Sequence, residues 1–373
     1  MKNAVLADHA QGRSVSGEFN EAAVGAYLAK VHGAAVEDVR ITPLGGGRQG
    51  DKGYGYGIPL RVDYRLGGTA RRAVLESVRP GPFGHEHMAD RAQQMLWAHD
   101  TFGRLAKHVR SLDVGAVRRT GELVPLGNAE ELFMLAEFIE GHEYADDLLR
   151  LRAGEPLRPL DLERADALCD YLVQIHKVRG KDPGLYVRRT RELVGHGECL
   201  FGVDDSYPLD GPVSPDVLCA IEQRAVGWRW KLRQRTHRLR QVHGDFHPWN
   251  ILFRDGADFS VLDRSRGEWG EPADDVACLA LNYLFFSLQR TGELEGDLER
   301  LWLGFWTRYL ERSGDAELLE VVAPHLAFRG LVMANPLWYP ALAADVREAL
   351  VRFVLNVLDD ESFDPGRAQD YLS

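Results

Sequence analysis

Hydrophobic and polar residues near the start of the chain follow helical spacing. Over residues 20–31 the apolar side chains recur every three or four positions, at Val24, Tyr27, Leu28 and Val31. Asn20 precedes this run and Gly33 follows it, which is typical of the two ends of a helix. The pattern therefore predicts a short amphipathic helix.

Strand-like patterns follow this helix. Residues 36–44 and 70–78 are rich in apolar and β-branched residues, and over residues 58–66 apolar and charged side chains alternate, as in a half-buried strand. A glycine-rich segment, residues 45–57, joins the first two of these strands. With a helix expected over residues 86–107, the pattern predicts a small antiparallel sheet accompanied by helices.

The rest of the chain is mainly helical in pattern. Two more strand candidates, residues 112–118 and 131–139, precede Gly141. Helices are then expected from Asp146 and over residues 162–176, 214–238, 272–290, 295–312, 315–333 and 341–358. We therefore expect an α+β protein with a small sheet-containing region over residues 18–138 and a larger, mostly helical region over residues 139–373.

Residues with the chemistry of phosphoryl transfer lie between two of the apolar runs. Such a reaction needs a carboxylate that receives or orients the proton of the acceptor hydroxyl, and oxygen ligands for a metal ion that neutralises the phosphates. Asp245 fits the first role, and Asn250 and Asp263 fit the second. This interpretation requires residues 251–254 and 259–262 to pair as a hairpin, so that Asp263 returns to the end where Asn250 lies.

These segments resemble the aminoglycoside phosphotransferase and choline kinase family, small-molecule kinases with a protein-kinase-like fold. The resemblance is carried by His243-Gly244-Asp245-Phe246-His247-Pro248 with Asn250, by Leu262-Asp263, and by Gly270-Glu271-Pro272-Ala273-Asp274-Asp275-Val276-Ala277. It covers nearly the whole chain and implies a two-lobed fold. It also implies Mg²⁺-dependent transfer of the γ-phosphate of ATP, or of GTP, to a small-molecule hydroxyl. In such a protein Asp275 would anchor the catalytic loop and His176 would be structural.

The resemblance also implies where a nucleotide would bind. Gly46 and Gly47 would let backbone N–H groups approach the phosphates. The backbone of Glu137 and Ile139, in the expected strand and hinge that join the lobes, would bind the adenine ring.

The chain departs from the family in the third strand, where Glu76 stands at the position that normally carries a phosphate-binding Lys or Arg. Four explanations stay open. Arg91 can pair with Glu76 and face the phosphates, or Lys52 can supply the missing cation. The site can bind nucleotide weakly or not at all, or the strand is misaligned by a residue or two.

Composition narrows the range of partners. The net charge of −11 argues against nucleic acid, because phosphate contacts need a basic surface. The charge is compatible with a cationic substrate, and equally with solubility alone. The acidic residues expected near the acceptor site are Glu140, Glu143, Asp147, Glu268 and Glu271. The basic residues of the segment 214–238, Arg238 among them, are expected to form a solvated helix face.

Two further observations bear on location. No apolar run approaches the roughly 18 residues of a membrane helix, so no membrane partner is expected. The chain has four cysteines, Cys169, Cys199, Cys219 and Cys278, which lie far apart and show neither metal nor disulfide spacing. Together these features favour a cytoplasmic protein.

Other functions stay open beside the kinase. A nucleotide-binding pseudokinase or regulatory protein is motivated by Glu76, and an interaction protein with a vestigial site is the third possibility. The intact set of Asp245, Asn250 and Asp263 favours the enzyme. The aromatic residues Trp302, Trp306, Trp338 and Tyr339 are expected to pack in the core rather than to form a cation-binding cage.

Overall fold

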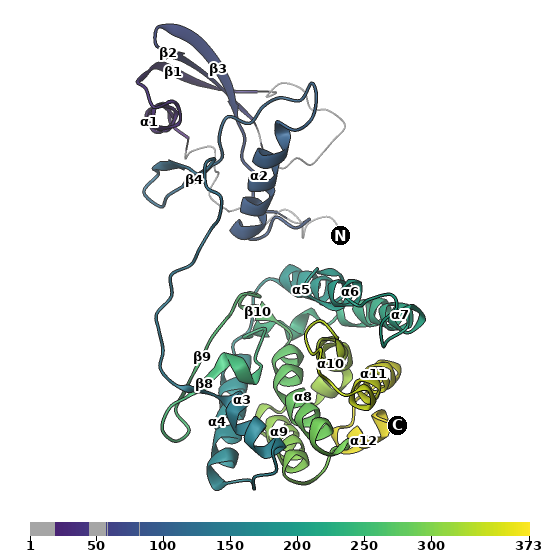
Figure 1. Ribbon diagram of the computed structural model, residues 1–373. Coiled ribbons are helices and arrows are strands. Elements are labelled where there is room, and N and C mark those ends of the chain that lie inside the picture. Colours follow the sequence, from purple (N-terminus) through teal and green to yellow (C-terminus); the bar gives the residue numbers. More distant parts are fainter. Residues whose placement is uncertain (1–18, 45–56, 58, 82) are drawn as a thin grey trace, which may run out of the picture. The chain divides into compact units, whose positions relative to one another are not determined.

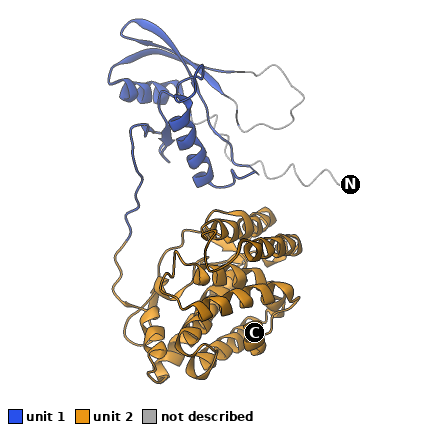
Figure 2. Ribbon diagram, turned by 45° about the vertical axis from the view of Figure 1, so that its right-hand side comes forward, with its two compact units in different colours: residues 1–136 blue, residues 137–373 orange. Residues whose placement is uncertain are grey.

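The computed structural model describes residues 19–44, 57, 59–81 and 83–373, which belong to two compact units (Figure 1). Unit 1 is Met1–Ala136 and unit 2 is Glu137–Ser373, coloured separately in Figure 2. Within the described residues, no helix combines the length and apolar character needed to cross a bilayer.

Unit 1 is a small antiparallel sheet with helices. Its elements are α1 (Glu21–His32), β1 (Val36–Pro43), β2 (Leu60–Leu66), β3 (Thr69–Leu75), α2 (Met88–Phe102), β4 (Gly115–Val117) and β5 (Leu123–Pro125). Strands β1, β2 and β3 pair in that order, all antiparallel, and β4 pairs with β5. The predicted strands over 36–44, 58–66 and 70–78 are confirmed to within a few residues.

The first helix of unit 1 begins and ends where the sequence predicts. The Asn20 side chain accepts a hydrogen bond from the Ala23 N–H at 2.8 Å, and Gly33 ends the helix in the left-handed conformation at φ 63°. Both are favourable end geometries for a helix. The helix buries Val24 and Leu28 against Val62 of β2, so the alternating pattern of that strand does place its apolar face inward.

The strand expected over residues 131–139 is absent, and this prediction is wrong. Residues 131–141 belong to no helix or strand, and Phe133, Leu135 and Phe138 are each more than 80% exposed. Apolar residues predict a strand only where another strand offers backbone partners. No described strand pairs with this segment.

Unit 2 is mostly helical. Its helices are α3 (Tyr144–Arg152), α4 (Pro159–His176), α5 (Pro183–Gly195), α6 (Leu200–Asp205), α7 (Pro215–Leu232), α8 (Pro272–Thr291), α9 (Gly296–Ser313), α10 (Ala323–Ala334), α11 (Ala344–Asp359) and α12 (Ala368–Tyr371). Short strands accompany them: β6 (His142–Glu143), β7 (Arg240–Gln241), β8 (Ile251–Phe253), β9 (Phe259–Val261) and β10 (Trp269–Gly270). The predicted fold class, a small antiparallel sheet followed by a mostly helical region, is confirmed.

Helix α8 is the centre of unit 2. It packs against α3, α9 and α10, and every residue from Pro272 to Leu288 is buried (Figure 1). A helix that is buried on all sides holds its N-terminus in a fixed place. That N-terminus is next to the segment with the candidate catalytic residues.

Two predicted helices and one expected core residue need correction. The helix expected over residues 214–238 ends at Leu232, and the one expected over 315–333 is a 3₁₀ turn, η4 (Ala316–Glu320), followed by α10. Pro324 is well placed in the first turn of α10 because a proline there sacrifices no helical hydrogen bond. Trp302 and Trp306 are buried as expected, but Trp338 is 64% exposed.

Candidate active site

The hairpin formed by β8 and β9 assembles the candidate catalytic residues. Its register pairs Ile251 with Val261, so the start of β8 lies opposite the end of β9. The Asn250 side-chain amide donates to the Asp245 carbonyl at 3.0 Å, and the Leu262 N–H donates to the Asn250 carbonyl at 2.8 Å. The structure therefore brings Asp245, Asn250 and the residue after Leu262, Asp263, to one end of the hairpin.

Asp275 anchors the loop before Asp245. Its two carboxylate oxygens accept the backbone N–H groups of His243 and Gly244 at 2.8 and 2.7 Å, and its side chain is fully buried. The His176 ring lies 3.1 Å from the same carboxylate and hydrogen-bonds the Tyr309 hydroxyl at 2.7 Å. The expected structural roles of Asp275 and His176 are confirmed. Asp275 binds the loop backbone directly, and His176 binds Asp275.

The turn into Asp245 depends on glycine at position 244. Gly244 has φ 89°, in the left-handed region that side chains avoid. A Cβ there would lie 3.2 Å from the Arg266 Cβ. The loop can therefore pass closely beneath the segment that follows Asp263.

The side chain of Asp245 is held by an arginine that the sequence analysis missed. Arg329 of α10 donates from Nη1 to Asp245 Oδ1, and from Nη2 to the Gly244 carbonyl at 3.0 Å and to Asp274 Oδ1 at 2.9 Å. The other oxygen, Oδ2, lies 3.7 Å from His247 Nε2, which is beyond hydrogen-bond range. Among the described residues, one carboxylate oxygen of Asp245 is thus hydrogen-bonded by a charged side chain and the other is not.

These charges set the protonation state of Asp245. Burial by itself would raise the pKa of Asp245, but the positive charge of Arg329, followed by Arg266 and His247, outweighs burial and lowers the pKa. Burial also lowers the pKa of the His247 ring, against the opposing charge of Asp245. Asp245 is therefore ionised at neutral pH and accepts hydrogen bonds.

The sequence of α10 does indicate that Arg329 is buried and paired. The α10 sequence Ala-Pro-His-Leu-Ala-Phe-Arg-Gly-Leu-Val-Met-Ala is apolar except for His325 and Arg329, one helical turn apart. A charged residue inside an apolar helix must find a buried partner. The pattern does not reveal that this partner is Asp245.

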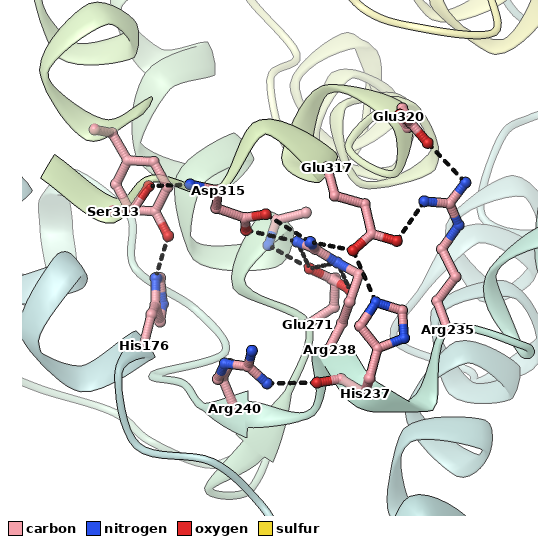
Figure 3. A network of polar contacts seen from close by, with 12 residues as sticks. His176, Arg235, His237, Arg238, Arg240, Glu271, Ser313, Asp315, Glu317 and Glu320 are labelled. Carbon is pink, nitrogen blue, oxygen red and sulfur yellow. Dashed lines mark hydrogen bonds and ion pairs between the residues drawn. The ribbon is translucent and has the colours of Figure 1, made fainter. Parts of the chain in front are cut away.

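Two of the acidic residues expected near the acceptor are already paired. Glu271 is 5% exposed and lies 2.6 Å from the Arg238 guanidinium (Figure 3). It also accepts a hydrogen bond from the Tyr186 hydroxyl at 2.7 Å. Asp147 forms an ion pair of 2.6 Å with Arg164. Neither carboxylate is available to a cationic acceptor, so this prediction is wrong for both. Glu140, Glu143 and Glu268 are exposed.

Arg238 is likewise not on a solvated helix face. It is 4% exposed and lies after the end of α7, in the turn η2 (Thr236–Arg238). Figure 3 shows its guanidinium between Glu271, Asp315 and Glu317. The network ties the N-terminus of α8 to η4.

The nucleotide residues expected in unit 1 are only partly described. Gly46, Gly47 and Lys52 lie outside the described residues. Arg91 donates to the backbone carbonyls of the three residues that precede α2. These are His85, Glu86 and His87, at 2.9, 3.3 and 2.8 Å.

Glu76 directly follows β3 and is exposed. In the part of unit 1 that is described, no ion pair joins it to Arg91, so the swapped pair considered from the sequence finds no support.

A pocket in unit 2 lies beside the same hairpin. Its volume is about 520 Å³, and it is lined by Ile139, Tyr171 and residues 257–261. Ile139, one of the two expected adenine-binding residues, thus borders a cavity, whereas Glu137 is exposed. The lining of the pocket includes β9, which ends two residues before Asp263.

The ligands proposed for a metal ion fit a hard cation. The Asn250 amide nitrogen is committed to the Asp245 carbonyl, which leaves its oxygen for a ligand, and the exposed Asp263 carboxylate accepts only the Ser265 N–H, at 3.2 Å, among the described residues. Amide and carboxylate oxygens suit Mg²⁺. No group of three or more His, Cys, Asp or Glu side chains that could hold a metal ion gathers in the described chain.

Comparison with known proteins identifies the family. The model of the "Phosphotransferase enzyme family" matches residues 61–312, and the chain belongs to this family. The resemblance inferred from the motifs is confirmed. No curated protein gives a match.

Among solved structures, similarity is found to an amicoumacin kinase in complex with AMP-PNP, Ca²⁺ and Ami (16% identity, 95% of this chain and 98% of that chain, TM-score 0.41). The aminoglycoside phosphotransferase APH(4)-Ia is 15% identical over 89% of this chain and 99% of that one, with a TM-score of 0.35. An ethanolamine kinase of Plasmodium vivax is 10% identical over 90% and 80%, with a TM-score of 0.34.

Proposed function

We propose that this protein transfers the γ-phosphate of ATP to a hydroxyl group of a small molecule in a Mg²⁺-dependent reaction. The observation that carries the proposal is the convergence of Asp245, Asn250 and Asp263 at one end of the β8–β9 hairpin. Each of the three has the oxygen chemistry that phosphoryl transfer requires.

Asp245 would accept a hydrogen bond from the acceptor hydroxyl and direct that oxygen at the phosphate. Asn250 and Asp263 would hold Mg²⁺, which when bound neutralises charge on the phosphate oxygens. Most of the rate enhancement would come from positioning and charge stabilisation, since the protein itself forms no covalent intermediate. The anchoring of the loop by Asp275 supports such a preorganised site.

The pocket beside Ile139 and Val261 is the proposed site of the adenine ring, with the backbone of Glu137 and Ile139 as its hydrogen-bonding edge. Gly46, Gly47 and Lys52 remain the proposed phosphate contacts from unit 1, and Arg91 a further cation.

The four thiols of the chain are free, which supports the proposed cytoplasmic location.

Nucleotide binding is tested by thermal unfolding with ATP, GTP or ADP, each with and without Mg²⁺. A ligand present at 100 times its Kd stabilises by about 2.7 kcal/mol, which raises Tm by roughly 2–5 °C at this size. We expect a Mg²⁺-dependent shift that Asp263→Ala abolishes. The matched control is Asp255→Ala, an exposed carboxylate in the turn of the same hairpin. A Tm that no nucleotide moves at millimolar concentration would refute the ATP-dependent reaction.

Transfer is tested by ADP release in a screen of hydroxyl-bearing acceptors. Asp245→Asn should keep the nucleotide-dependent Tm shift and lower the transfer rate by about 10²–10⁴-fold, the usual contribution of a positioned acid–base group. Equal rates in Asp245→Asn and the wild type would contradict the role of Asp245.

A second candidate is a regulatory protein that binds nucleotide without transferring phosphate. The acidic residue Glu76, at the end of β3, favours it, because a carboxylate near phosphates repels them. The two functions differ in outcome: the regulatory protein gives the Mg²⁺-dependent Tm shift but releases no ADP with any acceptor.

A further inference from the structure

The arginine that contacts the catalytic loop lies outside the residues that the family model matches. The family match ends at residue 312, whereas Arg329 belongs to α10, Ala323–Ala334. Its side chain is 8% exposed and reaches Asp245 across 84 residues of sequence. A separate segment of the chain therefore completes the environment of the candidate catalytic residue.

We infer that Arg329 is a positioning residue for the proposed phosphoryl transfer, holding one oxygen of Asp245 so that the other faces the acceptor hydroxyl. The inference rests on the proposed function. Arg329 binds Oδ1 of Asp245, whereas His247 Nε2 lies 3.7 Å from Oδ2, beyond hydrogen-bond range. Within the described structure, Oδ2 is therefore the oxygen left to orient a hydroxyl.

The contacts of Arg329 restrain the loop as well as the side chain. Nη2 donates to the Gly244 carbonyl at 3.0 Å and to Asp274 Oδ1 at 2.9 Å, so one guanidinium joins the backbone before Asp245 to the N-terminus of α8. The guanidinium also lies over the Phe328 ring, 4.8 Å from its centre. A planar fork with several donors at fixed angles can make these contacts together, whereas a lysine ammonium cannot.

Electrostatics explains why a cation is needed at this position. Asp274 is buried and Asp245 is half-buried, and both accept from the same guanidinium. Without it, the two carboxylates would lose their shared cation, and their mutual repulsion would favour protonation of one of them. Arg329 permits both to stay ionised.

Other groups face this pair from several elements, and none replaces Arg329. The Cys278 thiol of α8 lies 4.0 Å from Asp245 Oδ1, and His325 Nδ1 lies 4.0 Å from Asp274 Oδ1. Arg266 and His247 also add positive potential at Asp245. Burial lowers the pKa of the His325 ring, which favours its neutral form.

The test compares Arg329→Lys and Arg329→Gln with Arg347→Lys and Arg347→Gln. Arg347 is a matched control: it is 5% exposed, lies on α11, and donates to the carbonyls of Ala334 and Tyr339 rather than to a carboxylate. Steady-state transfer is measured for each variant, with the nucleotide-dependent Tm shift as a measure of binding. We expect Arg329→Lys to keep that shift and the acceptor KM within about threefold, and to lower kcat by about 10²-fold, as for loss of orientation at the reacting atom. Arg347→Lys should leave kcat within about twofold.

A double-mutant cycle of Arg329→Gln and Asp245→Asn gives a measurement that does not depend on turnover. The quantity measured is the midpoint of chemical unfolding of the wild type, each single variant and the double variant. Side chains that hold each other give non-additive midpoint changes. Additive changes, or an unaltered kcat in Arg329→Lys, would overturn the inference. If the Gln variant fails to fold, Asp274→Asn, which removes the second anchor of Arg329, should lower kcat by about tenfold; an unchanged kcat there also counts against the role.

Failure of the proposed function can be distinguished from failure of the positioning role. A wild-type protein that transfers phosphate to no acceptor refutes the reaction, and the positioning role with it. A wild-type protein that is active alongside an equally active Arg329→Lys refutes the positioning role alone.

Discussion

Asp204 of α6 is a carboxylate with an unfavourable environment. It is 6% exposed, and within the described structure neither of its side-chain oxygens has a hydrogen-bond partner. Burial, followed by the negative charges of Glu222 and Asp205, raises its pKa to about 8. Because a buried polar group without a partner costs free energy, this residue opposes folding whenever it is ionised.

Asp204→Asn is therefore expected to stabilise the protein at high pH. The pKa in the folded state is raised, so the favourable contribution of protonated Asp204 is complete below its unfolded pKa and is lost as pH rises toward about 8. At pH 9 the variant should be more stable by roughly 1–3 kcal/mol, the cost of an unsatisfied buried group. Urea unfolding at pH 4, 7 and 9 measures this. A gain that is the same at all three values would show that charge is not the cause.

At the scale of single residues, site residues that belong to one motif can be predicted from the sequence. Residues that reach the site from a distant part of the sequence cannot. Asp245, Asn250 and Asp263 are predictable because their spacing around two apolar runs implies a hairpin. Arg329 is not, because its contact with Asp245 depends on how α10 packs against α8. The pairing of Glu271 with Arg238 is hidden for the same reason.

At the scale of elements, the junction between η4 and α8 depends on a chain of ion pairs. Glu317 of η4 accepts from Arg235 at 2.6 Å and from His237 at 2.8 Å, and Arg238 joins it to Glu271, the residue that caps α8 (Figure 3). Burial would raise the pKa of Glu317, but the hydrogen bonds from His237 and Arg235 and the charge of Arg238 lower it to about 2.

The pH dependence of this junction follows from that pKa. A carboxylate with a lowered folded-state pKa contributes stability above its unfolded value, and that contribution is lost as pH falls toward about 2. Glu317→Gln should lower the unfolding midpoint at pH 7, with a difference from wild type that shrinks between pH 5 and pH 3. Glu320→Gln, which loses only the Arg235 contact at 2.9 Å, serves as the control and should change less. A Glu317→Gln difference that grows on acidification would contradict the assignment.

Most elements were predictable, and the exceptions have physical causes. Helical and alternating patterns located α1, β1–β3 and α8–α9, because these elements bury one face or all of their surface. The apolar segment 131–139 has the composition of a strand but no strand partner in the described structure. Helices α5 and α6 lie within residues 180–213, which are rich in Gly and Pro, so that helical periodicity is weak there.

At the scale of the whole molecule, the two units differ in the size of their cores. The buried apolar cluster of unit 1 comprises Val24, Leu28, Val62, Tyr64 and Leu123, whereas that of unit 2 extends over all of its major helices. The large aromatic side chains that are completely buried, such as Trp302 and Trp306, belong to unit 2. Buried apolar area is the main source of stability, so the two units should open with different free energies.

Hydrogen exchange followed by mass spectrometry should detect this difference. We expect backbone amides of α8 to exchange slowest and those of β1–β3 to exchange at least about tenfold faster, after correction for intrinsic rates. Tyr64→Ala, which removes the largest side chain of the unit 1 cluster, should accelerate exchange in residues 60–75 and leave α8 unchanged. Equal protection of β2 and α8 in the wild type would contradict the expected order.

The link between the catalytic loop and α10 also has a consequence for recombination among relatives. A chimera joined between residues 277 and 323 would take Asp245 and its anchor Asp275 from one parent and the residue at position 329 from another. Parents that balance the loop charge by different means would then yield hybrids that fold, retain the full motif and lack the arginine that the loop requires. Crossovers that keep residues 243–334 together avoid this mismatch. Functional chimeras should therefore inherit this long segment from a single parent.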